Sequence, residues 1–163
     1  MAIQGGKFLT FKVGQEIYGI PIAKVKEIIG MMILIPFAEA VGNLKGLINL
    51  RGKIIPVIDL RFKFGLEDLE DSGHNSVIVI ETSVSEKQML AGIMVDSVSE
   101  VITIATADIE PPPDHEARSE GDFLAGLGKL KNKVILILDN DKIINREELS
   151  WIEKYEQRGE QNV

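Results

Sequence analysis

The stretch GLINLRGKIIPVID, residues 46–59, decides the fold because the chain repeats it: residues 126–139 read GLGKLKNKVILILD. Aligning the two copies places the turn dipeptide Arg51-Gly52 over Lys131-Asn132. Glycine and asparagine are the residues that best tolerate a positive φ, and here they occupy the same place between two apolar runs. Each copy therefore predicts a tight hairpin between two strands.

A second pair of segments repeats in the same order. Residues 18–29, YGIPIAKVKEII, align with residues 91–102, AGIMVDSVSEVI, and share a glycine, a valine and a glutamate at one constant offset. The alternative is chance similarity between apolar strands, which explains the matched polar and turn positions less well. The chain is interpreted as two related halves, residues 7–70 and 74–145, each expected to form one barrel.

The segments between these landmarks are typical of short strands. Residues 8–13 alternate apolar and polar side chains, and residues 54–58 and 134–138 are nearly continuous apolar runs. Because Pro56 lacks an N–H, its strand is expected at a sheet edge or a bulge. Residues 83–88 are expected to be a polar loop between two strands. Several short strands per half favour small closed barrels over one open sheet.

A single longer helix is predicted at the C-terminal end, over residues 145–158. The Asn145 side chain can cap the start of the helix by accepting a backbone N–H. The Glu148 side chain, three positions on, can in turn accept the backbone N–H of Asn145. Leu149, Ile152 and Tyr155 then fall on one face. The pattern indicates an amphipathic helix whose apolar face packs on the core.

The composition fits one ordinary domain and limits its partners. The chain has 163 residues, 45% of them hydrophobic, and a net charge of −7. Such a charge argues against nonspecific binding to nucleic acid or to an anionic membrane, since both require a cationic face. There is no cysteine, no uninterrupted apolar run long enough to span a membrane, and no basic-then-apolar segment at the N-terminus.

Catalytic candidates are few. His74 and His115 each lie in a polar, turn-rich stretch, where a solvated side chain is the expected state. Asp59, Asp96 and Asp139 each follow a strand-like run, and we interpret them as acceptors for backbone donors rather than as acid–base catalysts. We predict no catalytic residue.

The run Asp139-Asn140-Asp141 resembles the start of a calcium loop, but the pattern fails. Ile143 occupies the next ligand position, and Ile144 stands where the loop requires glycine. A turn or helix-capping role is predicted instead, and no metal site is expected.

Two features could belong to a binding surface or to ordinary structure. Arg51, at the tip of a hairpin, is either a solvated surface arginine or a guanidinium that contacts a partner's carboxylate or carbonyls. Met31 and Met32 belong either to the core or to an adaptable contact surface.

Residues 46–61, followed by Phe64-Gly65, resemble the CheW-like domain family of chemotaxis coupling proteins. The segments 19–28, 92–101 and 123–128 support the resemblance, which extends from about Lys7 to Trp151. It implies one CheW-like domain over residues 1–163. The implied fold is mainly β: two pseudo-symmetric five-stranded SH3-like barrels packed on a shared apolar core, with short helices and a C-terminal helix.

The resemblance also implies a function without catalysis, cofactor or metal. Such a protein would be an adaptor that couples the cytoplasmic helical tips of methyl-accepting chemoreceptors to the CheW-like regulatory domain of the chemotaxis histidine kinase. It would be cytoplasmic and recruited to membrane-associated receptor arrays without inserting into the membrane. Because the chain ends soon after the domain, we expect a free-standing coupler.

Site residues carried over by position form two predicted surfaces. The receptor-binding surface would comprise Leu9, Ile22, Val25, Arg51, Gly52 and Val98. The kinase-binding surface would comprise Glu27, Ile28, Ile29 and Gly46.

Two other functions fit the sequence less well. A small barrel could bind nucleic acid, but the acidic charge and the lack of a basic, aromatic strand face oppose it. An enzyme would need a nucleophile–base pair or a metal cluster, which the sequence does not offer.

Overall fold

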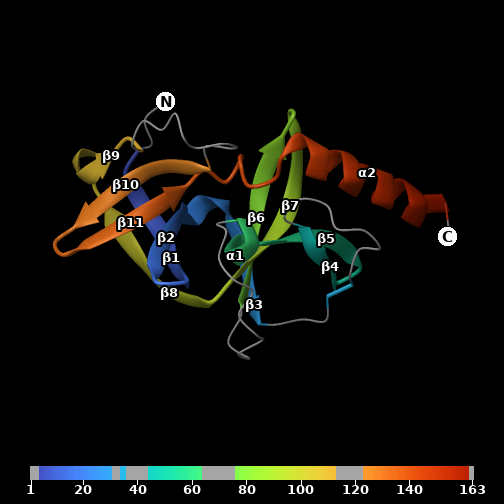
Figure 1. The fold of residues 1–163 in the computed structure, drawn as a ribbon, viewed down its shortest axis with the longest axis horizontal. Helices are drawn as coiled ribbons and strands as arrows, with labels where there is room; N and C mark the ends of the chain where they lie inside the picture. Colours follow the sequence, from blue (N-terminus) through green and yellow to red (C-terminus); the bar gives the residue numbers. More distant parts are fainter. Residues whose placement is uncertain (1–3, 31–33, 36–43, 64–75, 113–122, 162–163) are drawn as a thin grey trace.

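The computed structural model describes residues 4–30, 34–35, 44–63, 76–112 and 123–161, which form two sheets and a C-terminal helix (Figure 1). Short helical turns connect some of the strands. In chain order the elements are β1 (Gly6–Val13), β2 (Glu16–Pro21), η1 (Ile22–Lys24), β3 (Val25–Gly30), β4 (Leu44–Leu50), β5 (Lys53–Asp59), α1 (Leu60–Lys63), β6 (Ser76–Val84), β7 (Lys87–Val95), β8 (Ser97–Ile104), η2 (Thr106–Asp108), β9 (Ile109–Glu110), β10 (Leu124–Leu130), β11 (Lys133–Leu138) and α2 (Arg146–Gln161).

The strands divide into a six-stranded sheet and a five-stranded sheet. The first has the order β8-β1-β2-β11-β10-β9, and the second has the order β3-β6-β7-β5-β4. Neighbours pair antiparallel except at β2–β11 and at β5–β7, which pair parallel. Figure 1 shows the six-stranded sheet on the left and the five-stranded sheet on the right, with α2 extending to the right above it. The mainly β, SH3-like architecture is therefore confirmed.

The two halves of the chain exchange strands. The first half gives β1 and β2 to the six-stranded sheet and β3, β4 and β5 to the five-stranded sheet, while the second half does the reverse. The prediction that residues 7–70 and residues 74–145 each form their own barrel is therefore wrong. The repeat itself is present, because β3-β6-β7-β5-β4 has its equivalent in β8-β1-β2-β11-β10. The chain crosses between the sheets after β2 and again after β7.

One core cluster lies between the two sheets and is shared by them. It combines side chains of β1 and β2 with side chains of β5, β6 and β7, and Leu149 and Ile152 of α2 close one side of it. Phe11, Ile20 and Ile93 in this cluster have no exposed surface. Burying each such side chain stabilises the fold by about 1.5–3 kcal/mol. The shared core is what holds the two sheets in one unit.

The hairpin between β6 and β7 is longer than the sequence predicts. Residues 83–88 were expected to be a loop, but pairing continues to Val84 and Lys87, so that only Ser85 and Glu86 form the turn. Both have left-handed backbone angles, with φ of 50° and 66°. Neither is glycine or asparagine, so the turn carries no sequence signal of the usual kind.

A sheet edge or a bulge is predicted at Pro56, and the ladder of β5 with β4 does contain a bulge, between Leu44 and Gly46. The edge, however, is wrong for Pro56. Its strand, β5, lies inside the five-stranded sheet between β7 and β4 and not at an edge. The parallel ladder between β5 and β7 nevertheless joins only residues 57–59 to residues 92–94. It stops beside Pro56, which has no N–H to extend it.

The C-terminal helix begins as predicted. Glu148 N–H donates to Asn145 Oδ1 over 2.7 Å, and Asn145 N–H donates to Glu148 Oε1 over 2.9 Å. These reciprocal bonds confirm the capping box. The helix runs to Gln161, three residues beyond the predicted end. Within the described ranges, no helix has the length and apolar character needed to cross a membrane.

Candidate functional site

The tip of the β4–β5 hairpin is a two-residue turn formed by Arg51 and Gly52, as predicted. Leu50 pairs with Lys53 on either side of it. Arg51 has φ of 53° and Gly52 has φ of 85°, the left-handed pair that matches the twist of a hairpin. The Gly52 N–H donates to Asn49 Oδ1 over 2.9 Å, which fixes the turn. The turn thus holds the Arg51 side chain at a defined point on the surface.

Arg51 forms a bidentate ion pair with Glu27 of β3. Its Nη2 lies 2.7 Å from Glu27 Oε1, and its Nη1 lies 3.1 Å from Glu27 Oε2. The arginine side chain is 73% exposed and the glutamate side chain 28%. The hydrogen bonds from Arg51 lower the pKa of Glu27, and the same bonds raise the pKa of Arg51. The pair ties the hairpin tip to an edge strand of the same sheet.

This ion pair joins residues that the sequence assigned to two different partners. Arg51 was placed on the receptor-binding surface and Glu27 on the kinase-binding surface, but the structure makes them direct neighbours. They are 24 residues apart in the chain, and no local pattern could have paired them. We call Glu27, Arg51 and the turn residue Gly52 the Glu27–Arg51 patch. Ile28 follows Glu27 in β3, so its side chain points to the opposite face of the strand.

The apolar residues of the predicted receptor-binding surface lie where the chain crosses between the sheets. Ile22 and Val25 follow the first crossing and Val98 follows the second, and all three are half-buried against the shared core. Leu9 is different: only 3% of its surface is exposed, and it belongs to the core cluster itself. Leu9 therefore offers almost no surface to a receptor in the described conformation, and its role in receptor binding stays a prediction.

The predicted kinase-binding residues also differ in exposure. Ile28 is 47% exposed, whereas Ile29 is half-buried against the core cluster inside the five-stranded sheet. Gly46 is buried, and a Cβ there would lie 2.7 Å from the carbonyl oxygen of Ile35. The glycine thus has a packing reason of its own, because a second segment of backbone passes against it.

Other exposed apolar side chains are not among the predicted site residues. Ile54 is 43% exposed, Val101 48% and Val134 51%. The repeat could have found Val101, since its counterpart Ile28 is a predicted site residue. Ile54 and Val134 are counterparts of each other, and no sequence signal singles out either. Met31 and Met32 lie outside the described residues, so the alternatives for them stay open.

A second, more buried ion pair connects the two sheets. Arg61 of α1 donates through Nε and Nη2 to both carboxylate oxygens of Asp96, at 2.5 Å each. Asp96 Oδ2 also accepts the Gly14 N–H over 2.8 Å. Since Asp96 stands between β7 and β8 and Gly14 between β1 and β2, these contacts fix the two sheets to each other. We call Arg61, Asp96 and Gly14 the inter-sheet clamp.

The three strand-end aspartates accept backbone donors, as predicted. Asp59 Oδ1 accepts the Arg61 N–H and Asp139 Oδ1 accepts the Asp141 N–H, each over 3.0 Å. The third, Asp96, accepts the backbone N–H of Gly14 within the inter-sheet clamp. Among the described residues, no group of three or more His, Cys, Asp or Glu side chains could hold a metal ion. His74 and His115 lie outside the described residues.

Comparisons with known proteins agree with this fold. The model of the CheW-like domain family matches residues 7–148. A protein named chemotaxis protein CheW from Klebsiella aerogenes is 36% identical over 149 residues, 91% of this chain and 87% of its own length. Another protein of that name, from Helicobacter pylori, is 31% identical over 142 residues, 86% of this chain and 82% of its own.

A solved structure supports the same assignment. The scaffolding protein TtCheW from Thermoanaerobacter tengcongensis superposes with a TM-score of 0.73 at 34% identity, and the match covers 85% of this chain and 91% of that protein. Sequence and fold therefore agree over nearly the whole length. The chain belongs to the CheW-like domain family.

Proposed function

We propose that this protein is a chemotaxis adaptor that couples the cytoplasmic tip of a chemoreceptor to the regulatory domain of the chemotaxis histidine kinase. The observation that carries the proposal is the family match over residues 7–148, together with relatives of similar length that are named chemotaxis protein CheW. The protein acts without catalysis, in the cytoplasm, at membrane-associated receptor arrays.

The geometry of the Glu27–Arg51 patch, and of the apolar side chains near it and at the sheet crossings, supports an adaptor function. A receptor tip is helical, and a helix is recognised by an apolar strip with polar edges. Val25 and Val98 offer half-buried apolar surface at the sheet crossings, and Arg51 offers an exposed guanidinium on a rigid turn. Ile28, 47% exposed beside Glu27, offers an apolar anchor for the second partner.

The ion pair between Glu27 and Arg51 can couple binding of the two partners, because Glu27 belongs to the predicted kinase-binding surface and Arg51 to the predicted receptor-binding surface. Glu27 holds Arg51 in one orientation through two hydrogen bonds. A partner carboxylate that binds Arg51 competes with Glu27 for the guanidinium. A partner that binds Glu27 weakens the two hydrogen bonds that orient the Arg51 side chain. Binding of one partner therefore shifts the population of states offered to the other.

The test is a binding measurement with each partner offered separately. The receptor cytoplasmic fragment and the kinase regulatory domain, from the same organism, are titrated into the protein by calorimetry. We expect both to bind, and we expect Arg51→Glu to weaken the receptor complex about tenfold or more. Lys131→Glu is the matched control, because Lys131 holds the equivalent left-handed turn position with φ of 44°. A folded protein that binds neither partner contradicts the proposal.

A further inference from the structure

Strands β5 and β7 are neighbours along only part of their length. They run parallel and hydrogen-bond where residues 57–59 face residues 92–94. If the ladder continued toward their N-terminal ends, the Leu90 carbonyl would accept the N–H of residue 56, which is proline. The ladder ends there, and a groove of about 580 Å³ opens beside Leu90 and Lys53. We call residues 53–56 and 87–91 the β5–β7 seam.

The β7 side of the seam presents backbone groups that lie outside the ladder with β5. Val84 and Lys87 flank a two-residue turn and form a hydrogen-bonded pair, so bonded pairs recur at every second position along the hairpin. Gln88 and Leu90 occupy the positions between, and their N–H and C=O groups point away from β6. The ladder with β5 joins only residues 92–94 of β7, so neither Gln88 nor Leu90 belongs to it.

The opposite edge of the same hairpin shows how such groups are normally satisfied. On β6, the Ser83 N–H donates to Asp141 Oδ1 over 2.9 Å. The Glu81 carbonyl accepts from Asn140 Nδ2 over 3.1 Å. Side chains of the turn after β11 thus replace a missing strand beside β6. The edge of β7 has no such substitute among the described residues, so it remains free to accept a strand from outside.

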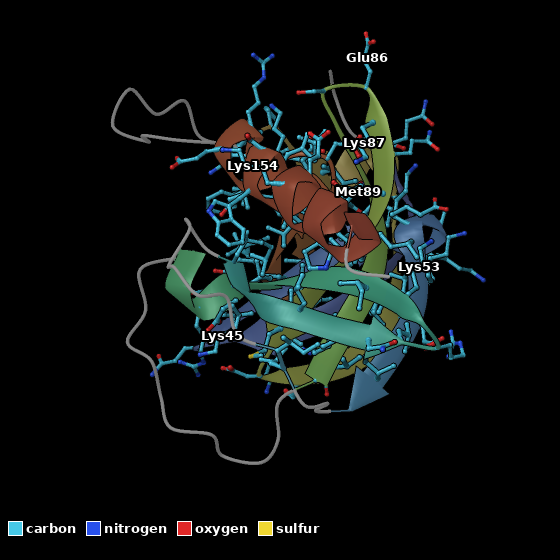
Figure 2. The ribbon with its side chains drawn as sticks, turned by 90° about the vertical axis from the view of Figure 1, so that its right-hand side faces the viewer. Lys45, Lys53, Glu86, Lys87, Met89 and Lys154 are labelled. Carbon is cyan, nitrogen blue, oxygen red and sulfur yellow. The ribbon has the colours of Figure 1, made fainter. Side chains whose placement is uncertain are left out.

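Lysines surround this edge. Lys24, Lys26 and Lys53 all line the groove, in a chain whose net charge is −7. Lys26 is paired with Glu81 at 2.7 Å. Lys24 and Lys53 form no ion pair with any described residue. The charge of Lys24 also lowers the pKa of Glu81, whereas Lys53 has no acidic side chain within ion-pair distance among the described residues. Figure 2 looks onto this face and labels Lys53 on β5 and Met89 on β7.

We propose that the β5–β7 seam binds an extended acidic peptide segment of a partner protein. The peptide hydrogen-bonds to Gln88 and Leu90 as an added strand, and its carboxylates pair with Lys24 and Lys53. A compact polyphosphate fits less well, because Glu81 and Asp141 also line the groove and repel dense negative charge. The seam shares no residue with the Glu27–Arg51 patch, and the proposal does not depend on the adaptor function.

The first test concerns the free backbone groups. Hydrogen exchange followed by NMR should show fast exchange at the Gln88 and Leu90 amides and slow exchange at Met89, whose N–H points toward β6. Equal protection at all three positions would mean that the seam is already closed, and the proposal would be wrong.

The second test is a titration with a synthetic peptide, acetyl-VEVEVE-amide, followed by amide chemical shifts. We expect saturable shifts at Ile54, Gln88 and Leu90, and slowed exchange of the Gln88 and Leu90 amides. Lys53→Glu should weaken binding about tenfold or more, and Lys133→Glu, the equivalent position of the other hairpin, should leave it unchanged. Absence of shifts at millimolar peptide, or equal binding of acetyl-VQVQVQ-amide, overturns the proposal. Since neither receptor nor kinase is present, failure here leaves the proposed function untouched.

Discussion

The inter-sheet clamp should make a larger contribution to stability than any exposed ion pair of this protein. Replacing Arg61 by Met removes two charge-assisted hydrogen bonds to Asp96 and leaves that carboxylate with the Gly14 N–H. Such bonds contribute about 1.5–3 kcal/mol each when shielded from water. The side chains of Arg61 and Asp96 are 16% and 23% exposed, so partial solvation reduces this sum. We expect Arg61→Met to cost about 2–3 kcal/mol.

The measurement is the free energy of unfolding in urea, with thermal unfolding beside it. For a chain of this length each kcal/mol lowers the Tm by about 2–4 °C, so a loss of about 4–12 °C is expected. Lys26→Met is the control, because the Lys26–Glu81 pair is also in close contact, at 2.7 Å, but its side chains are 51% and 45% exposed. It should cost less than about 1 kcal/mol.

A double-mutant cycle with Asp96→Asn isolates the interaction itself. We expect a coupling energy of about 2 kcal/mol between Arg61 and Asp96. A coupling below about 0.5 kcal/mol, or equal destabilisation by Arg61→Met and Lys26→Met, would refute the reasoning that burial makes the clamp stronger.

Three further predictions concern the helix cap, the hairpin turn and the surface ion pair. Asn145→Ala should lower the free energy of unfolding by about 1 kcal/mol through loss of the capping box, and circular dichroism should show earlier melting of helical signal; unchanged stability would contradict this. Gly52→Ala, at φ of 85°, should cost about 1 kcal/mol in urea unfolding, whereas Gly30→Ala, with open space around it, should cost less. Carbon-detected NMR titration should find the pKa of Glu27 below its ordinary value and higher in Arg51→Gln. Because the folded-state pKa is depressed, the stability from this pair is present above the unfolded-state pKa and is lost as pH falls through the folded-state pKa; a pKa unmoved by the substitution would disprove the role of Arg51.

Features encoded in a few consecutive residues could be predicted from the sequence. The capping box of Asn145 and Glu148 and the turn at Arg51-Gly52 both depend on contacts within three or four positions. The internal repeat could be recognised for the same reason, because aligning two short segments of the chain is enough to reveal it. The strand-end aspartates belong to this group, because two of them accept donors two residues further on.

Features that depend on distant pairings could not be predicted. The exchange of strands between the halves leaves the local pattern of each strand unchanged, because an apolar strand has the same composition in either sheet. The pairing of Glu27 with Arg51 and the burial of Leu9 both follow from how sheets and hairpins pack. The long β6–β7 hairpin was missed for another reason: Ser85 and Glu86 adopt left-handed angles without a residue type that signals them.

The exchange of strands has a consequence for how the chain folds. Each sheet needs strands from both halves, so neither sheet can be completed by a growing chain until the second half has emerged. The pairing of Leu9 with Val101 closes a loop of about ninety residues before either sheet has all its neighbours. Such long-range closure slows folding and leaves no half that is stable alone. The protein should therefore unfold in one cooperative transition, and the two barrels should appear and disappear together despite their separate sheets.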